Sequence, residues 1–106
     1  DQLAAMPHME VDAFLKALAG PRPPHIIDLR SHNLATQAGH VPNAHLTEYK
    51  ALAQSLVGID KDYPIVTICA CPQDAGAVHA AYSLQRQGYR NAMPLRGGFA
   101  AWQAAQ

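Results

Sequence analysis

Residues 65–71 read Ile-Val-Thr-Ile-Cys-Ala-Cys, and residues 72–87 read Pro-Gln-Asp-Ala-Gly-Ala-Val-His-Ala-Ala-Tyr-Ser-Leu-Gln-Arg-Gln. The β-branched run at 65–68 is typical of a central parallel strand that is covered on both faces. Small and apolar side chains recur at helical spacing over 75–87, and Gly88 is expected to end that helix. The stretch therefore predicts a buried strand, a turn that carries both cysteines, and a helix.

The sequence on either side of this stretch repeats the alternation of helix and strand. Helices are predicted over 10–19 and 47–57, buried strands over 25–30 and 91–95, and a last helical turn after Gly97-Gly98. Strands that alternate with helices favour an α/β fold with a mainly parallel central sheet flanked by helices.

The length and composition favour one globular domain spanning residues 1–106 and exclude several classes of protein. The 106 residues are 49% hydrophobic and 15% charged, which is enough apolar material for a core and too little charge for a disordered chain. Eight Lys+Arg balance eight Asp+Glu, so the net charge gives no reason to expect a nucleic-acid partner or direct membrane contact.

The N-terminus and the apolar runs bear on the cellular location of the chain. No apolar run is long enough to span a bilayer, and the N-terminus lacks the order of a signal peptide. We therefore expect a cytoplasmic domain. A chain that begins at Asp1 is also compatible with excision from a longer protein or with tethering through it.

The two cysteines, Cys69 and Cys71, follow the predicted strand and precede the predicted helix. Backbone N–H groups and the helix dipole favour a thiolate at such a place, which makes a nucleophilic cysteine the leading interpretation. Cys69 also continues an apolar strand, so a structural role is an alternative for it. A Cys-x-Cys pair supplies two of the four ligands that structural zinc needs, and no metal site is predicted.

Asp28, Arg30 and His40 are the other polar residues that stand out. Asp28 and Arg30 lie two residues apart at a strand end and therefore point to the same side. We expect them to form a structural network near the site, with His40 organising its loop, because buried charges need partners.

Taken together, these segments resemble the rhodanese-like domain family. The resemblance rests on an Asp-x-Arg strand end, a Gly-His-Val-Pro turn, a cysteine loop followed by a helix, and a Gly-Gly-x-x-x-Trp close. They are, in order, Ile27-Asp28-Leu29-Arg30, Gly39-His40-Val41-Pro42-Asn43-Ala44, residues 65–89, and Leu95-Arg96-Gly97-Gly98-Phe99-Ala100-Ala101-Trp102. The resemblance implies a three-layer fold with a mainly parallel central sheet, and the activity of a sulfurtransferase or persulfide carrier that needs no cofactor.

The resemblance also implies which residues act. The catalytic residue is Cys71 when counted back from the following helix, and Cys69 when counted forward from Pro64; we prefer Cys71. The cradle around the nucleophile would be Pro72, Gln73, Asp74, Ala75 and Gly76.

That loop contains no cation, and Asp74 is expected to repel thiosulfate, so efficient use of thiosulfate is not expected. The partners would be a small-molecule or protein sulfur donor and a thiol acceptor, with a persulfide donor preferred. The alternatives are a non-catalytic docking or regulatory module and a thiol-redox element in which Cys69 and Cys71 resolve each other.

Overall fold

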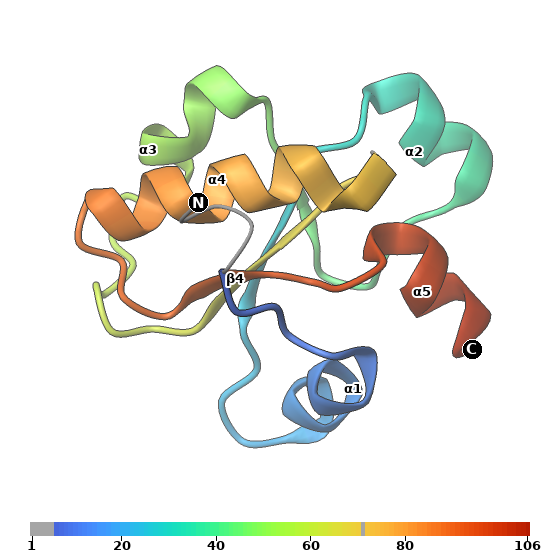
Figure 1. Ribbon diagram of the computed structural model, residues 1–106, viewed down its shortest axis with the longest axis horizontal. Helices are drawn as coiled ribbons and strands as arrows, with labels where there is room; N and C mark the ends of the chain where they lie inside the picture. Colours follow the sequence, from blue (N-terminus) through green and yellow to red (C-terminus); the bar gives the residue numbers. More distant parts are fainter. Residues whose placement is uncertain (1–5, 71) are drawn as a thin grey trace.

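The computed structural model describes residues 6–70 and 72–106 (Figure 1). Its helices are α1 (Val11–Ala19), α2 (His32–Ala38), α3 (Leu52–Ser55), α4 (Ala75–Arg86) and α5 (Gly98–Ala104), with short 3-10 helices η1 (Tyr49–Ala51) and η2 (Pro72–Asp74). Its strands are β1 (His25–Asp28), β2 (His45–Leu46), β3 (Ile65–Ile68) and β4 (Ala92–Pro94).

The strands form one four-stranded sheet in the order β2-β1-β3-β4, and every neighbouring pair is parallel. β3 is central and fully buried, as its β-branched sequence predicts. An isolated parallel bridge joins Met9 to Leu95 beside β4. The sequence analysis did not predict β2, and the helix predicted over 47–57 is instead the short pair η1 and α3.

Alternating residues of the strands face two separate apolar clusters. Ile27 and Ile65 pack with α3 and α4, whereas Ile26 and Val66 pack with Phe14 of α1. Figure 1 shows α3 and α4 on one side of the sheet and α1 on the other. The predicted three-layer α/β fold is therefore confirmed. No helix within residues 6–70 and 72–106 is long and apolar enough to cross a membrane.

The turn before α5 packs directly against the backbone that follows β3. The Phe99 N–H donates to the carbonyl oxygen of Cys69 at 3.2 Å. Gly98 has φ +58°, and a Cβ placed on it would lie 2.2 Å from the Cys69 oxygen. Only glycine can occupy this position without moving the chain that carries the cysteines.

Two histidines stack where the edge strand β2 meets β1. The rings of His25 and His45 have centroids 4.5 Å apart and planes inclined by 14°. Burial lowers the pKa of His25 below its ordinary value, and the nearby His45 lowers it further. The native state therefore favours an uncharged His25.

We predict that Gly98→Ala destabilises the protein more than Gly58→Ala does. Gly58 also has a positive φ, +87°, but a Cβ there would meet nothing within 4 Å. Gly58→Ala should cost about 1–2 kcal/mol for the left-handed conformation alone. Gly98→Ala should cost roughly 1–3 kcal/mol more because the Cβ clashes with backbone. Urea unfolding measures the free energy of unfolding of both variants. Equal losses of stability would show that the close contact with Cys69 does not add to the cost.

We also predict that His25 makes the fold sensitive to acid. A histidine whose pKa is lowered on folding contributes stability that is complete above its unfolded pKa of about 6.5 and is lost as the pH falls below that value. Between about pH 7.5 and pH 5 the His25→Phe variant should lose less stability than the wild type. The exposed His32 supplies the control His32→Phe. Parallel pH profiles for wild type and His25→Phe would refute the prediction.

Candidate active site

Cys69 follows the last residue of β3 and is 2% exposed. Its sulfur accepts the backbone N–H of Ala77, in the first turn of α4, at 3.4 Å. Thr67, two residues earlier on the same face of the strand, donates its hydroxyl to the Ala77 carbonyl at 2.8 Å. The amino end of α4 is thus fixed over the end of β3, with an amide directed at sulfur, and such an environment favours a thiolate.

The preferred nucleophile of the sequence analysis, Cys71, lies outside the described residues. The chain after it bends sharply into α4, because Gln73 and Asp74 both adopt the left-handed conformation with φ of 55° and 60°. Residues other than glycine adopt this conformation at a cost in free energy, so other contacts must hold the turn in place. Ala75 and Gly76, expected in the loop cradle, form the start of α4.

One contact that holds this turn comes from Asp74 itself. The Asp74 side chain is largely buried, and its Oδ2 accepts the N–H of Gly97 at 2.9 Å. The same oxygen lies 3.9 Å from Nε2 of His8. The sequence analysis expected Asp74 to face and repel an anionic donor. The Asp74 carboxylate binds the turn before α5 and ties the two turns together, and Asp74 also borders a cavity beside them, so its effect on an anionic donor stays a prediction.

Asp28 and Arg30 form the predicted network below the cysteine turn. Both are buried, and the Arg30 guanidinium binds the Asp28 carboxylate through Nε at 3.1 Å and Nη2 at 2.7 Å. Nη2 also donates to the Gly39 carbonyl at 2.8 Å. The guanidinium carbon lies 3.8 Å from the centre of the Phe99 ring. Because the Phe99 N–H donates to the Cys69 carbonyl, this network helps to hold the backbone of Cys69 in place.

His40 does not join that network. It is exposed in the loop after α2, and the neighbouring Gly39 supplies the carbonyl that Arg30 binds. Gly39 has φ +96°, so the turn itself presents this carbonyl to the buried guanidinium. The structure thus brings together two of the three residues expected near the site.

A cavity of about 510 Å³ lies beside the turn between β3 and α4. Its lining comes from the turn, from α4 and from two distant segments, and consists of His8, Gln73, Asp74, Ala75, Val78, His79 and Arg96. Arg96 supplies the cation that the loop sequence lacks, and its Nε donates to Glu10 at 2.7 Å.

His8 and Arg96 were not predicted from the sequence as neighbours of the site. The available signal for Arg96 was its position directly before Gly97-Gly98, whose turn closes on the cysteine segment. Among residues 6–70 and 72–106, no three His, Cys, Asp or Glu side chains are grouped so as to hold a metal ion.

Comparison with known proteins identifies relatives across nearly the whole chain. The family model for the rhodanese-like domain matches residues 10–105. The thiosulfate sulfurtransferase GlpE of Pseudoalteromonas translucida is 32% identical over 80 residues, 76% of this chain and 73% of that one. GlpE of Shewanella oneidensis is 27% identical over 103 residues, 97% of this chain and 98% of that one.

Solved structures show the same fold. The rhodanese-like domain protein from Staphylococcus aureus superposes with a TM-score of 0.77 at 24% identity, covering 92% of this chain and 91% of that one. The human single-domain sulfurtransferase TSTD1 gives a TM-score of 0.78 at 19% identity, with 96% and 99% covered. With the family match, the parallel sheet and the cysteine turn in agreement, this chain belongs to the rhodanese-like domain family.

Proposed function

We propose that this protein is a sulfurtransferase in which a cysteine thiolate in the turn after β3 carries a sulfane sulfur. The observation that carries the proposal is the amide of Ala77 directed at the sulfur of Cys69, at the amino end of α4. That contact puts the amino end of α4 at the end of β3, and we propose that its N–H groups and helix dipole stabilise negative charge on a sulfur carried by the turn between them. The similarity to relatives named thiosulfate sulfurtransferase supports the same activity.

Cys71 is the proposed nucleophile. A sulfur donor must reach the attacking sulfur, and Cys69 is 2% exposed beneath the start of α4. The burial of Cys69 therefore favours a supporting role for it and leaves Cys71 as the thiol that receives sulfur. Cys69 remains the alternative nucleophile, and paired variants separate the two.

The reaction consists of two displacements at sulfur. The Cys71 thiolate attacks the outer sulfur of thiosulfate, the S–S bond breaks, and sulfite leaves with the electron pair. A persulfide donor reacts in the same way and releases a thiolate. An acceptor thiolate then attacks the terminal sulfur of the Cys71 persulfide, and the Cys71 thiolate is the leaving group. No external oxidant, metal or cofactor enters this sequence.

The cavity beside the turn bears on the choice of donor. Arg96 would attract an anionic donor, while Glu10 and Asp74 offset part of its charge. We therefore propose that thiosulfate binds weakly and that a persulfide, small or protein-borne, is the better donor. The acceptor would be a thiol of either kind.

We predict that sulfur loading depends on Cys71 and not on Cys69. After incubation with thiosulfate or a low-molecular-weight persulfide, mass spectrometry should show one added sulfur in the wild type and in Cys69→Ser, and none in Cys71→Ser. Loading of Cys71→Ser with none in Cys69→Ser would reverse the assignment. Loss of two hydrogens would indicate a Cys69–Cys71 disulfide and a redox element. An unchanged mass with every donor would indicate a docking module.

We predict that Arg96→Gln raises KM for thiosulfate by about fivefold with little change in kcat, because one charge near an anion contributes roughly 1 kcal/mol in water. The matched control is Arg90→Gln, since Arg90 pairs with Asp62 on the exposed surface. Glu10→Gln should lower KM, because it removes the carboxylate that binds Arg96. Equal KM values in all three variants would show that the cavity does not take the donor.

A further inference from the structure

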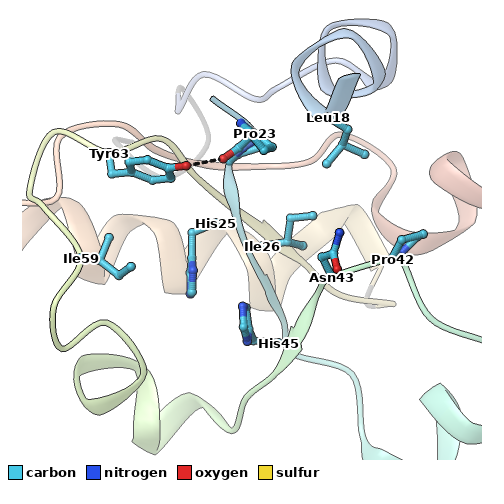
Figure 2. A pocket seen from close by; sticks show the side chains of 10 residues that line it. Leu18, Pro23, His25, Ile26, Pro42, Asn43, His45, Ile59 and Tyr63 are labelled. Atoms are coloured by element: carbon cyan, nitrogen blue, oxygen red, sulfur yellow. Dashed lines mark hydrogen bonds between the residues drawn. The ribbon is translucent and has the colours of Figure 1, made fainter. Parts of the chain in front are cut away.

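A second cavity, of about 530 Å³, lies beside the starts of β1 and β2 (Figure 2). His25 and His45, the first residues of β1 and β2, both border it, whereas Cys69 follows the last residue of β3. Because the strands are parallel, the cavity lies toward the opposite end of the sheet from the candidate active site. Its volume is within the range of about 300–1,000 Å³ that is typical of small-molecule sites.

The wall of this cavity is mostly apolar and, among residues 6–70 and 72–106, its lining includes no Asp, Glu, Lys or Arg, although the Arg22 guanidinium carbon lies 4.8 Å from the centre of the Tyr63 ring. Its residues come from the end of α1, the proline segment before β1, the start of β1, the turn before β2, the start of β2 and the segment before β3: Leu18, Pro23, Pro24, His25, Ile26, Pro42, Asn43, His45, Ile59 and Tyr63. The Tyr63 hydroxyl donates to the Pro23 carbonyl at 2.7 Å, which fixes one wall. The three prolines have few conformations to lose, so the cavity is largely formed in advance.

The wall has few polar groups, and one of them lacks a hydrogen-bond partner. Nε2 of His25 is buried and has no hydrogen-bond partner among the described residues. A buried polar atom without a partner is costly, and a ligand that bonds to it removes that cost. The ring that stacks on His25 belongs to the exposed His45, and exposed side chains change rotamer rapidly. Because Nε2 is buried, a ligand in the cavity reaches it only after the rings of His25 and His45 rearrange.

The polar and apolar side chains of the wall indicate which class of ligand would fit the cavity. An uncharged His25 has one nitrogen that donates and one that accepts. We assign the proton to Nδ1, so that the buried Nε2 carries the lone pair and not an unsatisfied N–H. A matching ligand then supplies an N–H or O–H. Its body must be apolar to match the proline and aliphatic wall, and flat to lie against the ring of Tyr63 or of a histidine.

We infer that this cavity is a second ligand site, which binds an uncharged, planar aromatic molecule that donates one hydrogen bond to His25. The site is independent of the sulfur-transfer proposal, because it shares no residue with the cavity beside the cysteine turn. The chemical class covers heteroaromatic rings with an N–H and phenols.

The first test compares two probes on the unmodified protein. Indole carries a ring N–H, and N-methylindole has nearly the same shape without that donor. In NMR titrations at about pH 7.5, indole should produce saturable shifts at residues that line the cavity. N-methylindole should bind at least about fivefold more weakly, which is the contribution of one hydrogen bond. Equal affinities, or shifts that do not saturate or that lie outside the cavity, would overturn the inference.

The second test uses matched variants. His25→Phe keeps a ring in the stack and removes the nitrogen, so its affinity for indole should fall at least about fivefold and its preference over N-methylindole should vanish. His32→Phe, at an exposed histidine outside the cavity, should bind indole as the wild type does. Unchanged discrimination in His25→Phe would overturn the inference. If this variant does not fold, the comparison of the two probes on the wild type decides the question.

Discussion

The site depends on the contact between the Gly97-Gly98 turn and the backbone of Cys69. At this contact the Phe99 N–H binds the Cys69 carbonyl, and the missing side chain of Gly98 lets the two backbones meet. The Asp74 carboxylate accepts the N–H of Gly97 in the same turn. The two segments are far apart in sequence, so their meeting requires the completed sheet, with β3 beside β4. The cysteine turn is thus positioned by tertiary structure and not by its local sequence.

The buried charges serve the same contact. Arg30 is neutralised by Asp28, bound to the Gly39 carbonyl and placed over the ring of Phe99. A buried ion pair contributes little net stability, because desolvation offsets the Coulomb attraction. Its role here is geometric. It fixes the side chain of Phe99, whose backbone N–H binds the Cys69 carbonyl. The network therefore supports the site without taking part in the chemistry.

The sequence predicted the elements whose signal is local. The β-branched run of β3 and the helical spacing of α4 identified both, and Gly and Pro residues marked their limits. β2 was missed because its two residues, His45 and Leu46, are exposed and carry no strand pattern. The helix expected over 47–57 breaks into η1 and α3, so that only part of the amphipathic pattern became α-helix.

Within the site, the sequence correctly predicted a network of Asp28 and Arg30 and placed Cys69 at the end of the central strand. It could not give the direction of the Asp74 side chain, which depends on two successive left-handed residues and on a partner in a distant turn. Arg96 and His8 were missed for a similar reason. They reach the cavity only because the N-terminal segment pairs beside β4.

The measurement that tests the central claim most directly is the pH dependence of alkylation at each cysteine, resolved by peptide mass spectrometry. The account predicts that Cys71 alkylates with an apparent pKa clearly below the ordinary value of about 8.5, while the buried Cys69 reacts slowly in the folded protein. Titration of both thiols at or above that value would contradict it. The turn would then not activate a nucleophile, and a docking role would account better for the fold.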